Sequence, residues 1–446
     1  MTKRSIAVAI AVAASTLLSA PAAAGHETDR GAHVTGPLPA SLPGDPRSPD
    51  IAETYPFFAT PDNLAARGYV EQEFLLSGRA DGWDTSGLRV AEDVAYTTRV
   101  IVRRPAKAHR FNGTALVEWQ NVTAGYDLDA LWDVDTVTRA GYAWVGVSAQ
   151  RVGVDQLRGW SPARYGTLDV TGSGTLVADE LSYEIFAQAG KALTASGRLL
   201  GGLKARTVLA IGASQSAARM TVYYDRVLPQ VQAVFDGYGL IVGTAPARRG
   251  PEPVFQVLSE TDVRSAVRPP DTGTFRRWEV AGSAHSGYAG QVYRQPISVR
   301  DLGAAPVYDC AQPPFSRVPL HHVVAASFAH LERWVRHGTP PPSAKPLVVE
   351  ADGTKQRDEL GLARGGVRLS QVAAPTALNS GDNTGESFCR LFGTHVPFDA
   401  AVLDRLYRGP AAYVARVVRA DLGNIRAGYL LPADAAENLR EAATHP

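Results

Sequence analysis

The stretch Thr207–Ser216, which reads TVLAIGASQS, decides how this chain is expected to fold. It begins as an apolar run and continues as a Gly-x-Ser-x-Ser turn, after which residues 216–227 have the pattern of a helix stopped by Pro229. A buried strand that passes through such a turn into a helix is typical of a nucleophile elbow, which lifts a serine hydroxyl clear of the sheet. The tight turn requires small residues two positions before and after that serine, and Gly212 and Ser216 satisfy this requirement.

The serine at the centre of the turn, Ser214, is therefore interpreted as a nucleophile. The last position of such turns is usually glycine, and Ser216 in its place weakens the match slightly. The alternative interpretation is an ordinary loop whose serines cap the following helix, because serine is a favoured N-cap residue. The strand and the helix on either side favour the nucleophile.

Further apolar runs predict that this turn belongs to a mostly parallel sheet. Continuously apolar strands are buried on both faces, which is typical of a parallel sheet covered by helices. Such runs cover residues 115–119, 142–147, 207–211, 233–235 and 254–258, and two earlier runs, 69–76 and 96–102, alternate apolar with polar residues. Helical spacing in 181–193 and 324–335 supplies covering helices. The alternation predicts the α/β class, a twisted sheet with helices on both sides.

A serine of this kind needs a general base and an acid that orients it further along the chain. The apolar strand 254–258 leads to Asp262, and a strand at 277–280 ends in a loop of small residues that holds His285. We predict that His285 is the base and Asp262 the acid. Two other carboxylates are alternative acids: Glu260, two residues earlier, and Asp236, which follows the preceding predicted strand. The ordinary role for any of the three is in a surface loop or at a helix cap.

Acyl transfer also needs hydrogen-bond donors for the oxyanion, and elbow serines use two backbone N–H groups. Gln215, directly after the serine, is expected to supply one. The other is expected from the loop after residues 115–119, at Asn121 or Val122. The alternative is that Asn121 simply turns the chain.

The N-terminus has the pattern of a cleavable secretory signal peptide, residues 1–24. Lys3 and Arg4 precede an apolar run from Ile6 to Leu18, and Ala22–Ala24 supplies a small-residue cleavage site near Ala24. The run is too short to cross a bilayer, which takes roughly 20 residues. Its removal leaves a chain close to neutral, because the whole sequence carries 45 basic and 44 acidic side chains. We therefore expect an exported protein without membrane insertion or nucleic-acid binding.

The remaining chain is expected to be one catalytic domain with additions. Residues 25–61 are rich in proline, which predicts an extended arm without regular helix or sheet. Residues 62–446 would form the domain, with cap segments at 150–178 and 286–320 and an extension at 340–446. Helical patterns lie near 399–407, 410–421 and 433–442 of that extension.

Two cysteines, Cys310 and Cys389, are predicted to form a disulfide because the chain is expected to be exported; two buried free thiols are the alternative. The sequence has no H-E-x-x-H, no C-x-x-C, no Walker loop and no G-x-G-x-x-G after a strand. We therefore expect neither a metal nor a cofactor.

At these motifs the chain resembles a bacterial family known as alpha/beta hydrolase domain proteins. The resemblance runs from about residue 65 to about 420 and implies the α/β-hydrolase fold, but it brings no substrate with it. The matching stretches are Val117–Val122, Val147–Gln150, Arg164–Gly166, Leu181–Phe186, Ser214–Ala217, Asp236–Gly237, Ser259–Asp262 and Trp278–Gly282, with His285.

Together these features predict a secreted serine hydrolase that cleaves a small-molecule carboxylic ester through an acyl-serine intermediate. An acyltransferase or amidase would use the same triad, and a non-catalytic ligand-binding protein would use the same fold. Five aromatic residues in predicted loops are candidates to line the pocket or, equally, ordinary core residues: Trp119, Tyr126, Trp132, Trp160 and Tyr288.

Overall fold

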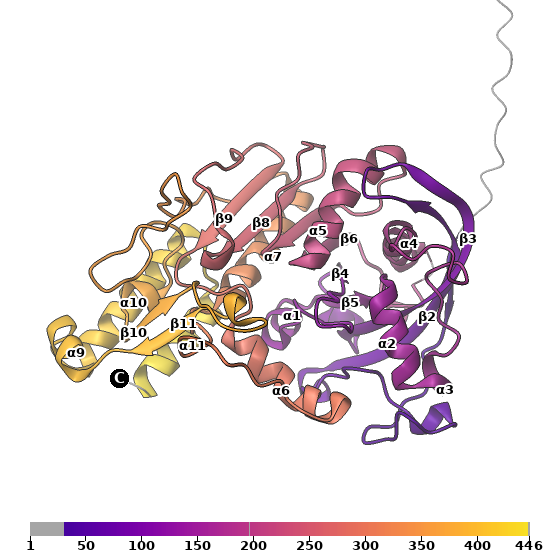
Figure 1. Ribbon diagram of the computed structural model, residues 1–446, viewed down its shortest axis with the longest axis horizontal. Coiled ribbons are helices and arrows are strands. Elements are labelled where there is room, and N and C mark those ends of the chain that lie inside the picture. Colours follow the sequence, from indigo (N-terminus) through magenta and orange to yellow (C-terminus); the bar gives the residue numbers. More distant parts are fainter. Residues whose placement is uncertain (1–30, 196, 445–446) are drawn as a thin grey trace, which may run out of the picture. The chain divides into compact units, whose positions relative to one another are not determined.

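The computed structural model describes residues 31–195 and 197–444, so the predicted signal peptide lies outside the described residues. Within them, nine strands form one sheet in the order β1-β2-β3-β5-β4-β6-β7-β8-β9 (Figure 1). The pairs among β5, β4, β6, β7, β8 and β9 are parallel, and the others are antiparallel. The strands are β1 His33–Thr35, β2 Tyr69–Trp83, β3 Arg89–Pro105, β4 Thr114–Trp119, β5 Ala143–Val147, β6 Thr207–Ala213, β7 Gly237–Ile241, β8 Val254–Ser259 and β9 Phe275–Val280.

The central strands are apolar throughout because each packs into two separate cores. Along β4, Ala115 and Val117 belong to one core cluster, and Leu116 between them belongs to the other. The first cluster includes residues of α4 (Ser182–Ala195) and α5 (Gln215–Val222). The second includes residues of α1 (Val134–Ala140) and α7 (Leu320–His337). The predicted α/β class, a mostly parallel sheet with helices on both faces, is confirmed.

The C-terminal extension contains helices where the sequence predicted them, together with a small sheet that it did not predict. Strands β10 (Ala377–Ser380) and β11 (Thr394–Pro397) pair antiparallel. Figure 1 shows this sheet and the last helices on the opposite side of the fold from β2 and β3. The remaining helices of the described chain are α2 Arg151–Trp160, α3 Pro162–Tyr165, α6 Tyr288–Leu302, α8 Ser370–Ala373, α9 Ala400–Leu406, α10 Pro410–Ala427 and α11 Pro432–Thr444.

One predicted strand was wrong. Residues 233–235 precede β7 and form no strand themselves. Their apolar character comes from packing, because the ring of Phe235 lies against the rings of Phe186, Tyr223 and Tyr238 in the core. An apolar run of three residues does not distinguish a strand from a buried loop.

The proline-rich segment before residue 62 is also more ordered than predicted. Residues His33–Thr35 form β1, which pairs with the outer edge of β2. The rings of Phe57 and Phe58 are buried in the first core. An edge strand needs a hydrogen-bonded partner on only one side, and the prolines that would interrupt it come after Thr35, so the segment joins the sheet.

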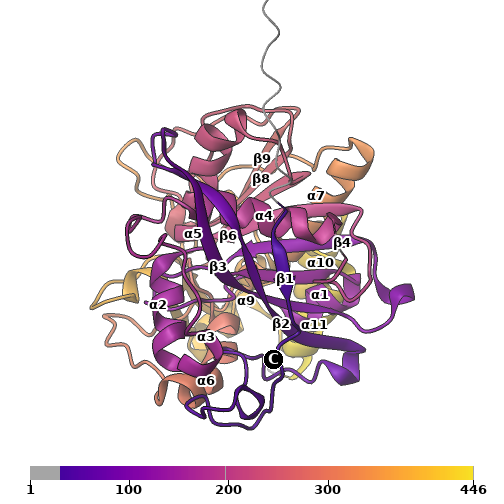
Figure 2. The ribbon, with the colours of Figure 1, turned by 90° about the vertical axis from the view of Figure 1, so that its right-hand side faces the viewer.

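The predicted cap at residues 150–178 lies beside β2 and β3, where Figure 2 shows α2 and α3. The side chain of Arg164 in α3 forms an ion pair with Glu73 of β2 at 2.5 Å, and Asp169 pairs with Thr97 of β3. Residues 151–178 do not line the cavity described below. Buried charge pairing therefore holds this segment against the antiparallel edge of the sheet.

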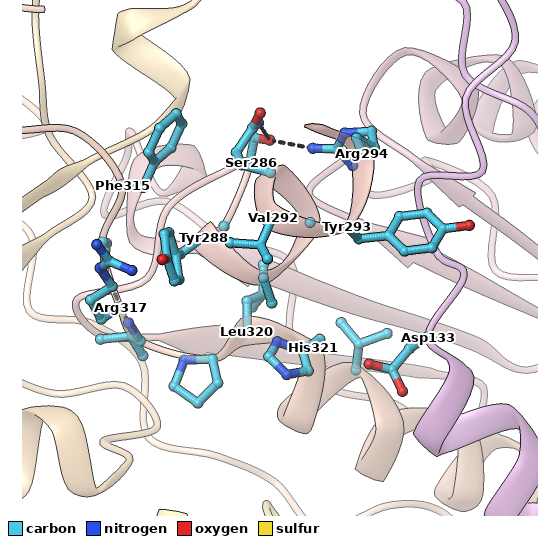
Figure 3. Close-up of a pocket in the computed structure, with 18 of the residues that line it drawn as sticks. Asp133, Ser286, Tyr288, Val292, Tyr293, Arg294, Phe315, Arg317, Leu320 and His321 are labelled. Atoms are coloured by element: carbon cyan, nitrogen blue, oxygen red, sulfur yellow. Dashed lines mark hydrogen bonds between the residues drawn. The ribbon is translucent and has the colours of Figure 1, made fainter. Parts of the chain in front are cut away.

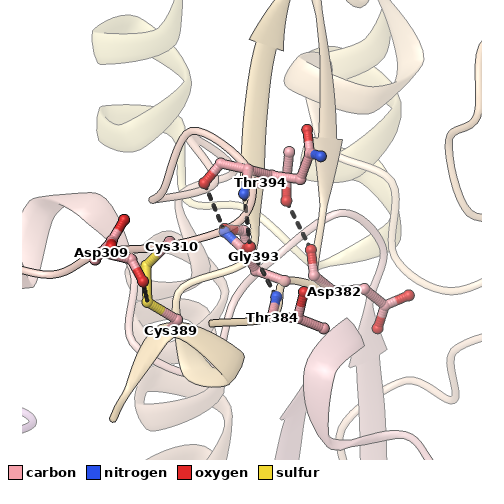
Figure 4. Close-up of a disulfide and its surroundings, with 9 residues drawn as sticks. Asp309, Cys310, Asp382, Thr384, Cys389, Gly393 and Thr394 are labelled. Atoms are coloured by element: carbon pink, nitrogen blue, oxygen red, sulfur yellow. Dashed lines mark hydrogen bonds between the residues drawn. A yellow bond between two sulfur atoms is a disulfide. The ribbon is translucent and has the colours of Figure 1, made fainter. Parts of the chain in front are cut away.

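A disulfide joins Cys310, after α6, to Cys389, before β11, across 79 residues of sequence (Figure 4). Cys310 also pairs through its backbone with Gly385 in an isolated bridge. Among the helices of the described chain, none has the length and apolar character that a membrane crossing requires.

Candidate active site

Ser214 stands at a sharp turn between β6 and α5. Its backbone has φ 57° and ψ −116°, a conformation that residues other than glycine rarely adopt. The close approach of strand and helix explains the neighbouring glycine: a Cβ on Gly212 would lie 2.6 Å from the sulfur of Met220 and 3.2 Å from the amide nitrogen of Ala217. Strain of this kind at a polar side chain is typical of a functional position.

The unusual serine at the end of the turn has a structural role. The hydroxyl of Ser216 accepts a hydrogen bond from the amide of Ala213 and donates one to the carbonyl of the same residue, both at 3.0 Å. Ser216 is fully buried. A serine at this position therefore closes the turn with its own side chain, which a glycine cannot do.

His285 and Asp262 meet at the carboxyl ends of neighbouring strands. Asp262 follows β8 and His285 follows β9, and the Nδ1 of His285 lies 2.7 Å from Oδ1 of Asp262. The other carboxylate oxygen of Asp262 accepts a 2.5 Å hydrogen bond from Ser259. The backbone N–H of His285 donates to the hydroxyl of Thr261 at 3.2 Å. Because the carboxylate engages Nδ1, the Nε2 of the imidazole is left as the proton acceptor.

Ser214 and His285 line the same cavity. Within residues 31–195 and 197–444 no hydrogen bond joins the hydroxyl of Ser214 to the imidazole of His285. Such hydrogen bonds are often long before substrate binds.

The two alternative acids lie elsewhere. Glu260 is fully buried, and its carboxylate accepts hydrogen bonds from the amides of Gly282 at 2.5 Å and Gly381 at 3.1 Å. It also pairs with Arg357 at 3.0 Å. Asp236 precedes β7 and accepts a hydrogen bond from the amide of Val208 near the start of β6. Ser214 follows the other end of the same strand, so Asp236 lies at the opposite end of the strands from it. Only Asp262 of the three reaches His285 in the described chain.

The candidate oxyanion donors differ in availability. The N–H of Gln215 is at the first position of α5, where no acceptor within the helix exists. The N–H of Asn121 donates to the carbonyl of Leu128 at 3.2 Å, which makes Asn121 the less available of the two predicted loop donors. Asn121 instead holds the elbow, since its side-chain amide donates to the carbonyl of Ala213 at 2.8 Å. The N–H of Val122 points to the side-chain oxygen of Gln215 at 3.4 Å, a weak contact that leaves Val122 as the second candidate.

Several histidines line the cavity, and their surroundings separate them. His285 is the one with a carboxylate oxygen within 3.5 Å among the described residues. Burial, followed by the neighbouring charges of His321 and Arg139, lowers the pKa of His322 well below its usual value. Burial and then Arg317 lower the pKa of His395. A carboxylate is what stabilises an imidazolium during proton transfer, so His285 is the suitable base.

Residues 34–440 match the family described as alpha/beta hydrolase domain. The chain belongs to this family. The predicted resemblance is confirmed, and membership supports a hydrolase. No curated protein matches the chain significantly.

Solved hydrolase structures resemble parts of this alpha/beta hydrolase at low identity. A prolyl endopeptidase shares 11% identity with a TM-score of 0.29, covering 55% of this chain and 38% of its own. The rice cell wall degrading esterase LipA from Xanthomonas oryzae shares 12% with a TM-score of 0.24, covering 41% and 47%. A putative dienelactone hydrolase from Klebsiella pneumoniae subsp. pneumoniae shares 12% with a TM-score of 0.26, covering 46% and 85%. This chain thus spans less than half the length of the first two, and values this low carry no argument about activity.

The cavity of this hydrolase has a volume of about 1210 Å³ and walls from distant parts of the sequence (Figure 3). Helix α6, the loop that follows it and α7 form much of the wall, and α10 and α11 of the C-terminal extension add to it. Of the five aromatic candidates, Tyr126, Trp132 and Tyr288 line the cavity. Trp119 is fully buried, and Trp160 packs against the rings of Tyr55 and Phe57.

Sequence reasoning missed most of the polar and aromatic wall. The missed residues come from segments without a recognisable motif, and only their assembly around the cavity distinguishes them: Tyr293, Arg294, Tyr308, Phe315, Arg317, Phe392 and Tyr413. Many residues of the segment 286–320 line the cavity. Over residues 31–195 and 197–444, no group of three or more His, Cys, Asp or Glu is arranged to hold a metal ion.

Proposed function

We propose that this alpha/beta hydrolase is an exported serine hydrolase that cleaves a carboxylic ester of a small molecule. The observation that carries the proposal is the His285–Asp262 pair, 2.7 Å apart, sharing one cavity with the strained Ser214. The three residues occur along the chain in the order serine, acid, histidine, which the elbow-type hydrolases use. The disulfide and the signal-peptide pattern support export.

In the first half of the reaction, the oxygen of Ser214 attacks the ester carbonyl carbon and its proton passes to Nε2 of His285. Asp262 stabilises the imidazolium that results. The N–H of Gln215 donates to the oxyanion, with Val122 as the second donor. Collapse of the tetrahedral intermediate breaks the bond to the alcohol oxygen, which takes the proton from His285, and leaves Ser214 acylated.

In the second half, water attacks the acyl-serine. His285 accepts a proton from the water and returns it to the oxygen of Ser214 when the carboxylic acid departs. Transfer to an alcohol or cleavage of an amide would use the same groups. Product analysis in the presence of added methanol distinguishes hydrolysis, which yields the acid, from transfer, which yields the methyl ester.

A fluorophosphonate probe tests whether Ser214 is the nucleophile. We expect the probe to label the wild-type protein and the Ser86→Ala variant, which loses a hydroxyl on an exposed turn, but not Ser214→Ala. Ester hydrolysis should follow the same pattern. Labelling that persists in Ser214→Ala would remove this residue from the mechanism, and no labelling of any form would favour the non-catalytic binding protein.

A further inference from the structure

Arg294 lies in α6 and lines the cavity, with its guanidinium directed at Ser286 (Figure 3). Its Nη2 donates to the hydroxyl of Ser286 at 3.2 Å, and Ser286 directly follows His285. The guanidinium is therefore bonded to the residue that directly follows the proposed base. The rest of the guanidinium donors make no hydrogen bond in the described part of the chain.

The charge of Arg294 has no carboxylate of its own. No Asp or Glu oxygen of residues 31–195 or 197–444 lies within 4.0 Å of its guanidinium. Asp129, the carboxylate that acts on it from further away, is already paired with Arg103 at 2.7 Å and with the hydroxyl of Tyr293 at 2.9 Å. The phenols of Tyr126, Tyr293 and Tyr308 are its other electrostatic neighbours.

Three fully buried arginines of this protein, unlike the partly exposed Arg294, have carboxylate partners. Arg99 and Arg164 each lie 2.5 Å from a carboxylate oxygen of Glu73, and Arg103 lies 2.7 Å from Glu71. Burial lowers the pKa of Arg294, whereas charge pairing raises the pKa of Arg103 against its burial. An arginine still keeps its charge at neutral pH, so the cavity holds an uncompensated cation.

We propose that Arg294 binds a carboxylate of the substrate, so that the enzyme acts on esters that carry a free carboxylate in addition to the scissile bond. This inference rests on the proposed function. A guanidinium presents its donors in a planar fork that matches a carboxylate in two parallel hydrogen bonds. Tyr126, Tyr293 and Tyr308 are close enough to act on the same guanidinium, and a hydrogen bond beside such partly buried rings is stronger than one in bulk water. The substrate then supplies the counterion that the protein lacks.

A second cavity arginine, Arg317, provides a matched control. Its guanidinium lies over the ring of Tyr288, 3.2 Å from the ring centroid, so the ring face already offsets part of its charge. It lies in the loop between α6 and α7, and within the described residues it makes no hydrogen bond to Ser286.

Two pairs of esters test the proposal and locate the carboxylate. Monophenyl glutarate against phenyl valerate compares a carboxylate with a methyl group at the end of an acyl chain of equal length. 4-Acetoxybenzoate and 4-acetoxybenzamide place the difference on the leaving phenol, which carries a carboxylate in the first ester and an uncharged amide in the second. We expect the wild type to favour the anionic member of one pair in kcat/KM, and that pair identifies the side of the ester that carries the carboxylate.

The ratio of kcat/KM for the two members is then measured in variants. Arg294→Gln should lower the ratio by about 10-fold to 100-fold, since hydrogen bonds to charged groups contribute on that order. Arg294→Lys should retain part of the preference, and Arg317→Gln should retain most of it. A wild type that does not favour the anionic member of either pair, or an Arg294→Gln variant with an unchanged ratio, would overturn the proposal.

Binding separates failure of this inference from failure of the proposed function. Calorimetry with monophenyl glutarate and 4-acetoxybenzoate on Ser214→Ala measures carboxylate binding without turnover. We expect the additional Arg294→Gln change to weaken that binding and not the binding of the neutral partner ester. If the fluorophosphonate does not label the protein but the protein binds in this way, the serine-hydrolase proposal fails and the carboxylate site stands. If binding is equal with and without Arg294, the proposal of a carboxylate site fails.

Discussion

Two carboxylates that are two residues apart have different surroundings. Glu260 is turned into the protein, where backbone amides and Arg357 engage it. Asp262 is turned toward the imidazole of His285. Both carboxylates lie in the short helical turn Glu260–Asp262, and their different partners are the basis for proposing a structural role for the first and an orienting role for the second.

Replacing these carboxylates one at a time tests that assignment. We expect Asp262→Asn to reduce kcat by about 10² to 10⁴ without a large change in melting temperature, because the amide no longer stabilises the imidazolium. Glu260→Gln should instead lower the free energy of unfolding by about 1.5 to 3 kcal/mol, since charged hydrogen bonds are lost. Steady-state kinetics and thermal unfolding of both variants distinguish the two roles. A larger kinetic loss in Glu260→Gln would reverse the roles.

Among the structural elements, the junction of β6 and α5 sets the position of Ser214, the proposed nucleophile. A methyl group at Gly212 would meet the backbone of Ala217 and the sulfur of Met220. We expect Gly212→Ala to cost about 1 to 3 kcal/mol of stability and to reduce kcat, because the helix must move away from the strand. Gly273→Ala is the control, since nothing lies within 4 Å of a Cβ there. Equal melting temperatures and rates in both variants would show that the junction tolerates displacement.

The antiparallel edge of the sheet depends on one buried carboxylate. Glu73 of β2 is paired with Arg99 of β3 and Arg164 of α3, and it accepts from the hydroxyl of Tyr165 at 2.7 Å. Burial by itself would raise the pKa of Glu73, but the two guanidinium groups outweigh it and the pKa is lowered. A lowered pKa in the folded state stabilises the fold above the unfolded pKa, which is near 4.5, and this stabilisation is lost as pH falls below it.

Glu73→Gln should therefore destabilise the fold by about 3 to 5 kcal/mol at neutral pH, because it leaves two buried guanidinium groups without their partner. The difference in free energy of unfolding between wild type and variant should shrink as pH falls below about 4.5. Urea unfolding at several pH values measures it. A difference that grows on acidification would contradict this account of the edge.

At the scale of the whole described domain, the cavity depends on packing between segments far apart in sequence. The ion pair of Arg139 in α1 with Asp434 in α11 joins the C-terminal extension to the helical layer. The ion pair of Glu260 with Arg357 joins the C-terminal extension to the loop after β8. Across the cavity wall, the Cys310–Cys389 disulfide connects the loop after α6 to the segment before β11.

Removing that disulfide tests how far the wall depends on it. We expect the double variant Cys310→Ser, Cys389→Ser to lose about 2 to 4 kcal/mol of stability, because a long loop is no longer closed in the unfolded chain. The KM for ester substrates should rise more than kcat falls, since Phe388 and Phe392 beside the bridge line the cavity. Unfolding and kinetics with and without reductant on the wild type provide the control. A loss confined to kcat would indicate that the bridge positions the catalytic residues.

Local patterns were sufficient to predict the fold and the centre of the candidate site. The apolar run and small residues around Ser214 identify a strand, a tight turn and a helix, because each requirement is met by neighbours in the chain. The loop with His285 was predicted for the same reason. Asp236 was predicted to follow a strand at residues 233–235, but it precedes β7. A three-residue apolar run was too short to locate the strand.

Backbone hydrogen bonding and apolar periodicity act between residues close in sequence, so the amino-acid order of this protein carries its α/β class, its elbow and the succession of its strands. Which carboxylate meets His285, which segments line the cavity, and the lack of an ion pair of Arg294 among residues 31–195 and 197–444 depend on contacts between residues tens to hundreds of positions apart. Those contacts arise only when the layers pack, because burial and charge pairing are properties of the assembled interior and not of any one segment.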